Sequence, residues 1–111
     1  MDRQQAENLM PRFLNAVTGM AVAQGPVHAR LPDAVTQVVV FGERDFPEDL
    51  RPKYAELRAL LGAGIVPDGA RNHPDHRKQM PAYYLSPQKA RRAANLIIEL
   101  FETIVYTLNA P

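Results

Sequence analysis

The chain has 111 residues and no cysteine, and this absence removes several chemistries at once. Without thiols there is no disulfide bond, no thiolate-coordinated zinc and no cysteine nucleophile. The absence fits a reducing compartment, where disulfides are rare. The protein must therefore draw its stability from a packed core, and any catalysis must come from other side chains.

Long apolar runs are also missing. The longest uninterrupted apolar stretch has a few residues, whereas a membrane-spanning helix needs about 20. The first five residues, Met1 to Gln5, are polar and lack the apolar centre of a secretory signal. We therefore expect a cytoplasmic protein with no membrane partner.

What is present suits one domain covering residues 1–111. Hydrophobic residues make up 46% of the chain, which is ordinary for a globular protein and argues against general disorder. A chain of this length can bury a core. Apolar residues recur at three- and four-residue steps, the spacing of amphipathic helices. The expected fold is all-α, a four-helix bundle-like single domain with a long loop before the C-terminal helix.

Four helical segments are expected, and two of them contain a difficulty. They are residues 2–23, 32–41, 46–61 and the segment opened by Ser86 as N-cap with Pro87 as its first residue. Pro11 should kink the first helix or restart it, because proline lacks the N–H and clashes with the preceding turn. Val38 to Phe41 is also typical of a buried strand. We favour a helix there, because no second strand-like segment exists to pair with it.

The segment between the third and fourth helices, residues 62–85, is unusually long. Glycine and proline interrupt any regular element in it, at Gly62, Gly64, Pro67, Gly69, Pro74 and Pro81. A connection of this length in a small domain is usually functional or mobile. Functional residues are therefore best sought there.

Positive charge is concentrated in and just after this segment. Residues 1–70 have a net charge of −2, residues 71–92 of +5 and residues 93–111 of −2. A concentrated basic patch suits a partner that carries phosphate. The candidate phosphate or nucleic-acid contacts are Arg77, Lys78, Lys89, Arg91 and Arg92. The alternative is that these side chains form an ordinary solvated face.

The most informative segment is Arg71-Asn72-His73-Pro74-Asp75-His76, which lies shortly before the last helix. It matches the pattern Arg-Asn-x-x-x-His and resembles the signature of the HEPN superfamily (higher eukaryotes and prokaryotes nucleotide-binding domains). In that family the motif lies beside the start of the last helix of a four-helix bundle. The resemblance covers about the last 40 residues of this chain.

The resemblance implies a function and a set of roles. Many HEPN proteins are metal-independent endoribonucleases in bacterial toxin–antitoxin or anti-phage systems, and others only bind nucleotides or partners. Arg71 would hold the scissile phosphate through its planar fork of donors. His76 would be the general acid or base, and Asn72 would orient the phosphate or the histidine. No cofactor or metal is needed. A homodimer is implied, in which two copies of the motif face each other, and an antitoxin or other protein partner fits such a system.

The sequence departs from the family pattern in two places. A tyrosine often follows two places after the histidine, but Lys78 stands there in this chain. Pro74 lies inside the motif and disfavours regular helix through it. Tyr83 or Tyr84 could supply the missing aromatic group.

Two other interpretations stay open. His73 and His76 would share one face of a helix and could hold a metal, but Pro74 argues against that helix. The main alternative function is a non-catalytic helical interaction or regulatory module, such as a phage or plasmid accessory protein. Such a module would need an exposed apolar face and would tolerate alanine at Arg71 and His76.

Overall fold

The computed structural model describes all 111 residues, and its regular structure is entirely helical. The four α-helices are α1 (Arg3–Val22), α2 (Val27–Val38), α3 (Arg51–Leu61) and α4 (Pro87–Asn109). Five short 3₁₀ helices lie in the connections: η1 (Glu43–Asp45), η2 (Glu48–Leu50), η3 (Asp68–Ala70), η4 (His76–Gln79) and η5 (Pro81–Tyr84). The predicted all-α fold is confirmed. No helix has both the length and the apolar character needed to cross a membrane.

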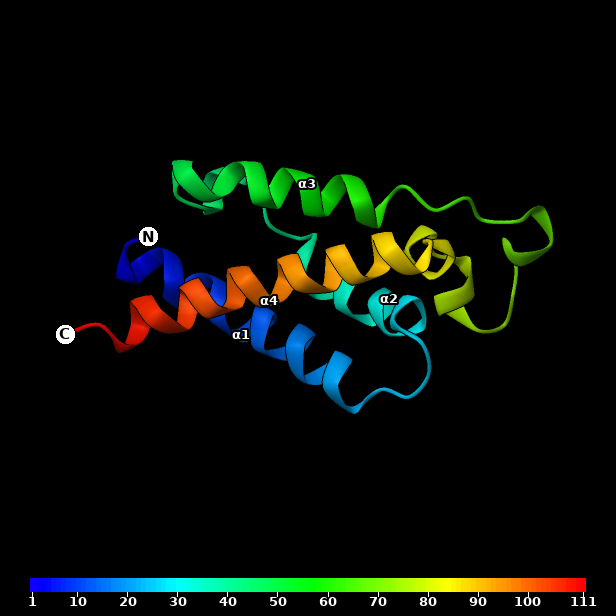
Figure 1. The fold of residues 1–111 in the computed structure, drawn as a ribbon, viewed down its shortest axis with the longest axis horizontal. Helices are drawn as coiled ribbons and strands as arrows, with labels where there is room; N and C mark the ends of the chain where they lie inside the picture. Colours follow the sequence, from blue (N-terminus) through cyan, green and yellow to red (C-terminus); the bar gives the residue numbers. More distant parts are fainter.

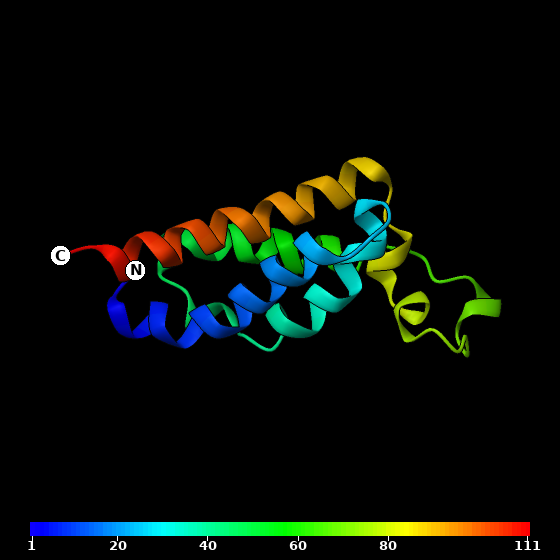
Figure 2. The same ribbon diagram turned by 90° about the horizontal axis from the view of Figure 1, so that it is seen from below.

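Helix α4 is the central element, since it contacts each of the other three α-helices. Helices α1 and α2 pack against each other and against α4, while α3 lies along another side of α4 (Figures 1 and 2). Helix α1 runs antiparallel to α4, and the Arg3 side chain donates to the Leu108 carbonyl at 3.2 Å. Both chain ends therefore lie at one end of the molecule, and residues 62–85 extend from the other (Figure 1).

The buried residues form one apolar cluster, and no polar or charged residue is buried. Apolar side chains at helical spacing on α1 and α4 supply about half of it. These are Ala6, Leu9, Phe13, Ala16 and Met20 on α1, and Ala90, Ala93, Leu96, Ile97, Leu100 and Ile104 on α4. Leu14 has the same helical spacing on α1 but is 44% exposed, so the buried face of this helix is narrower than its apolar residues alone predict.

The first helix begins with a reciprocal cap. The Asp2 carboxylate accepts from the Gln5 amide at 2.8 Å, and the Gln5 side chain accepts from the Asp2 amide at 3.1 Å. These bonds satisfy donors that the first turn would otherwise leave free. The predicted restart at Pro11 is wrong, because α1 continues through it to Val22. Pro11 faces solvent, so water can satisfy the carbonyl that loses its amide partner.

Helix α2 differs most from its predicted range. It begins at Val27, five residues earlier than expected, and it ends at Val38. Pro32, the first residue of the predicted range, consequently lies inside the helix, where it is buried. The strand alternative for Val38 to Phe41 is excluded, because the chain has no strand. Packing of α2 against α1 and α4 outweighs the local cost of an interior proline.

An aromatic cluster joins α1 to α3. Phe46 lies between the two helices, with its ring centroid 6.0 Å from that of Phe13 and 4.3 Å from that of Tyr54. Phe41 stacks on Phe13 at 6.1 Å. The Tyr54 hydroxyl donates to the Val38 carbonyl at 2.8 Å, which satisfies the one polar atom of the cluster. Burial raises the pKa of Tyr54, so this hydroxyl keeps its proton.

Helix α3 begins where its proline permits. Pro52 is in its first turn, where the missing N–H costs nothing, and the 3₁₀ turn η2 precedes the helix. Gly62 ends the helix, and Ser86 opens α4, with its hydroxyl accepting from the Lys89 amide at 3.3 Å. The end of α3 at Gly62 and the start of α4 at Ser86 confirm the prediction, because each depends on chemistry local to the turn. The predicted start of the third helix at residue 46 is wrong, because α3 begins five residues later, at Arg51.

Candidate phosphate-binding site

Residues 62–85, which we call the arm, leave the bundle at the end of α3 and return at the start of α4 (Figures 1 and 2). The returning half is fixed to the bundle. Ala82 and Leu85 are buried, and η5 packs against α2. The outgoing half passes close to it, because Gly64 lies against the main chain at Pro81. The arm is thus anchored at its base while its tip projects.

The three predicted catalytic residues all lie on the projecting part and are exposed. Arg71 follows η3, Asn72 occupies the next turn, and His76 begins η4. The Arg71 guanidinium pairs with the Asp68 carboxylate at 3.3 Å. No hydrogen bond joins Arg71, Asn72 and His76 to one another. The structure therefore places the three on one short segment but does not lock them into a fixed constellation.

The histidine held in place is His73, which sequence reasoning assigned only to the metal alternative. Its Nδ1 accepts from the Asp75 amide at 2.9 Å, and its carbonyl accepts from the Gln79 side chain at 2.7 Å. With Nδ1 occupied as an acceptor, the neutral ring has its proton on Nε2 and can donate it. No sequence signal separated the two histidines, because both bonds depend on how the chain turns at Pro74.

Asp75 and Arg77 form a bidentate pair beside this histidine. Two Arg77 side-chain nitrogens donate to the two Asp75 oxygens at 3.2 and 3.1 Å. The side-chain hydrogen bond from Arg77 lowers the pKa of Asp75, and the same bond raises the pKa of Arg77. Asp75 therefore stays ionised and engaged at neutral pH, so it is not a proton donor. The pair fixes the start of η4.

Neither tyrosine contacts the motif residues expected to act on phosphate. The Tyr84 hydroxyl donates to the Lys78 carbonyl, and the Tyr83 ring packs edge-on to that of His28 at 5.3 Å. Both rings instead brace the returning half of the arm. The idea that one of them replaces a missing catalytic aromatic group gains no support from these contacts.

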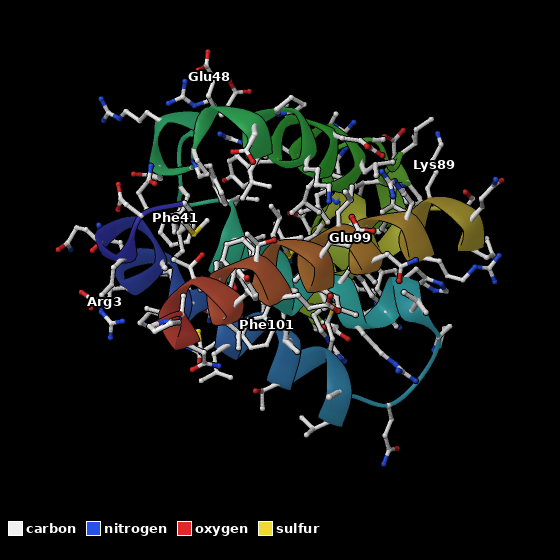
Figure 3. The ribbon with its side chains drawn as sticks, turned by 60° about the vertical axis from the view of Figure 1, so that its left-hand side comes forward. Arg3, Phe41, Glu48, Lys89, Glu99 and Phe101 are labelled. Carbon is white, nitrogen blue, oxygen red and sulfur yellow. The ribbon has the colours of Figure 1, made fainter.

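The basic residues at the start of α4 are exposed and share the end of the molecule from which the arm projects. Figure 3 shows Lys89 at the solvent-facing start of α4, with Glu99 farther along the helix. Arg92 makes a bidentate bond to Glu56 of α3 at 2.7 and 2.9 Å. Lys89 and Arg91 have no carboxylate partner within the chain. We call the arm together with residues 87–92 the basic end.

A hollow of about 210 Å³ lies where the arm meets α4. The side chains and main chain around it come from both halves of the arm and from the first turn of α4. They are Ala63, Gly64, Ile65, Tyr84, Leu85, Ser86 and Lys89. No sequence pattern indicated this hollow, although Gly64 permits the close passage at Pro81 that forms it. Lys89 is its only charged side chain, so the hollow suits an anionic group.

Metal-ligating side chains do not gather anywhere in the chain. No three histidine, aspartate or glutamate side chains lie close enough to hold an ion. His73 precedes η4 and His76 begins it, so the two do not share a helical face. The helical metal-site alternative is therefore wrong.

No family model, no curated protein and no solved structure matches this chain. Its function must therefore be inferred from the residues and geometry described above.

Proposed function

We propose that the protein binds RNA through phosphate contacts at its basic end, as a HEPN-like domain of a bacterial toxin or anti-phage system. Arg71, Asn72 and His76 would act on a bound phosphodiester without a metal. The observation that supports this most is that one end of the molecule carries both the motif and the hollow beside Lys89. Phosphate contacts from lysine and arginine supply most of the affinity in non-specific nucleic-acid binding.

The exposed ion pair of Arg71 is compatible with this role. Its side chain is 71% exposed and that of Asp68 is 94% exposed, so water screens the pair and it is weak. A phosphate could replace Asp68 and would offer the guanidinium two oxygens in a fork geometry. His76 is exposed as well, so its ring is free to approach a bound ribose or leaving oxygen.

A homodimer would supply the positioning that one copy lacks. The arm tip projects beyond the helices, so two tips can approach each other before the two bundles collide. Such a pair would place two motifs around one phosphodiester and would exclude part of the water. This arrangement is what the resemblance implies, and it makes cleavage depend on protein concentration.

The test is cleavage of a labelled single-stranded RNA by purified protein in EDTA. We expect His76→Ala and Arg71→Ala each to reduce the cleavage rate at least about a hundredfold, the usual scale for losing a general acid or base or a phosphate clamp. Fluorescence anisotropy of the same RNA measures binding separately. A wild-type protein that neither binds nor cleaves RNA would remove the proposal.

Arg44→Ala is the matched control for these variants. Arg44 is exposed and lies in η1, away from the arm, and it has no carboxylate partner. It removes the same charge without touching the basic end. Equal losses in Arg44→Ala and Arg71→Ala would mean that net charge alone binds the RNA. If the wild-type protein binds RNA but does not cleave it, its function is limited to phosphate binding.

A non-catalytic interaction module is less well supported. Such a module needs a continuous exposed apolar face, yet large exposed apolar side chains are scattered. The six that are exposed lie on α1, on the connection after α2, on the arm and on α4: Leu14, Val22, Val40, Ile65, Ile98 and Tyr106. Scattered apolar side chains of this kind are normal on monomeric surfaces.

A further inference from the structure

A second concave feature lies away from the hollow, between the later half of α1, the start of α2 and α4. It is a groove of about 240 Å³, and all but one of the side chains around it are apolar. They are Val17, Met20, Ala21, Val27, Ala94, Ile98 and the single polar residue Arg30. The three helices that form it pack directly on one another, so its walls are part of the bundle itself (Figure 2).

Arg30 is held at this groove without an acidic partner. Its Nε donates to the Gly25 carbonyl at 2.8 Å. Gly25 has a φ of +100°, a conformation that other residues rarely adopt, so a glycine-dependent turn presents that carbonyl. The two terminal nitrogens of Arg30 have no hydrogen-bond partner within the chain, and Arg30 is in no ion pair. A tethered guanidinium therefore offers two parallel donors beside an apolar wall.

The size of the groove limits what can occupy it. Pockets for drug-sized ligands usually enclose roughly 300–1,000 Å³. A partner helix is about 10 Å across with its side chains, so only single side chains of it could occupy a volume of about 240 Å³. An unbranched alkyl chain suits this volume, and its burial against Val17 and Ile98 would be favourable. The donor pair on Arg30 matches the two oxygens of a carboxylate.

We propose that this groove binds a medium-chain fatty carboxylate, with the alkyl chain between α1 and α4 and the carboxylate on the Arg30 guanidinium. The groove and the hollow use different residues, so this site is separate from the proposed RNA contacts. Each of the two proposals can fail without the other.

Isothermal titration calorimetry with octanoate, below its micelle-forming concentration, tests the site. We expect wild-type protein to bind octanoate and Arg30→Gln to bind it roughly tenfold or more weakly, because a charged hydrogen bond is lost. Acetate, which has no chain, and octanol, which has no charge, should both bind more weakly than octanoate. In ¹⁵N-labelled protein, octanoate should shift the amide signals of the residues around the groove.

Two further variants keep the test decisive. Ala21→Phe places a large side chain in the groove at an exposed position, so it should block octanoate while the thermal unfolding temperature stays near that of the wild type. Arg12→Gln removes an exposed α1 arginine outside the groove and should bind octanoate within twofold of the wild type.

Three results would overturn the proposal. One is no octanoate binding by folded wild-type protein. Another is equal binding of octanoate and octanol, with Arg30→Gln unchanged, which would indicate only apolar adsorption. The third is a dimer in light scattering that Ala21→Phe dissociates, because a second copy would then occupy the groove.

Discussion

Replacing Phe46 with alanine is expected to lower the free energy of unfolding by about 3–5 kcal/mol, the usual cost of deleting a buried phenylalanine. Phe46 is fully buried, and its ring touches those of Phe13, Phe41 and Tyr54. Phe13 on α1 and Tyr54 on α3 both contact the Phe46 ring, which therefore connects the two helices. The cavity left by alanine cannot close without moving one helix toward the other. The total free energy of unfolding of a small domain is about 5–15 kcal/mol, so the variant should be close to unfolding at 37 °C.

Urea denaturation followed by circular dichroism measures this effect, and Tyr106→Ala is its control. Tyr106 is 78% exposed on α4, so its truncation removes an aromatic ring without opening a cavity. The control should stay within about 0.5 kcal/mol of the wild type. A loss below about 1 kcal/mol in Phe46→Ala would show that the aromatic cluster does not join the helices as described.

Gly64→Ala is expected to displace the outgoing half of the arm from its returning half. A Cβ built on Gly64 would lie 1.8 Å from the Pro81 carbonyl oxygen and 2.8 Å from its carbon. The obstacle is main chain, which cannot rotate away as a flexible side chain can. We expect the free energy of unfolding to fall by about 3 kcal/mol, the upper end of the usual range for overpacking. Amide hydrogen exchange in residues 62–85 should become faster, and RNA binding should weaken.

Gly69→Ala tests whether the clash with Pro81, and not the loss of a glycine from the arm as such, explains that result. Gly69 also lies in the arm, but a Cβ there would meet nothing within 4 Å. Its backbone conformation is open to alanine, since Gly25 is the only glycine with positive φ. This variant should keep the wild-type exchange rates. Its free energy of unfolding should stay the same or rise by up to about 1 kcal/mol, because alanine restricts the unfolded chain more than glycine does. Similar exchange rates in both variants would contradict the described passage at Pro81.

The comparison of sequence with structure separates local from long-range effects. Ser86, Pro87 and Gly62 set helix boundaries through bonds within one turn, so their positions could be predicted from the sequence. A restart at Pro11 and a helix start at Pro32 were predicted from the same local chemistry, yet both prolines lie inside continuous helices. The packing of α1 and α2 against their neighbours outweighs the local helix-breaking preference of the two prolines. A single sequence does not show which helices will pack together.

The candidate site likewise combines residues that could be recognised in the sequence with geometry that depends on long-range packing. The resemblance selected Arg71, Asn72 and His76 as candidates, and the distribution of charge selected the basic residues that follow. The positioning of His73, the pairing of Asp75 with Arg77, and the hollow beside Lys89 all depend on where the arm returns. That return is fixed by Ala82 and Leu85 in the core, two apolar residues that carry no functional signal.

The distribution of charge along α4 has a consequence for how the molecule meets a ligand. Lys89, Arg91 and Arg92 lie in its first turns, and its only acidic residues, Glu99 and Glu102, lie in its second half. The peptide groups of a helix are polarised in the same sense, positive at the beginning and negative at the end. Side chains and backbone therefore add to one electric dipole along a molecule 51 Å long. The electric field of a polyanion exerts a torque on this dipole and turns the arm toward the polyanion before any contact forms. Added salt screens that field, so the number of productive encounters should fall as the salt concentration rises.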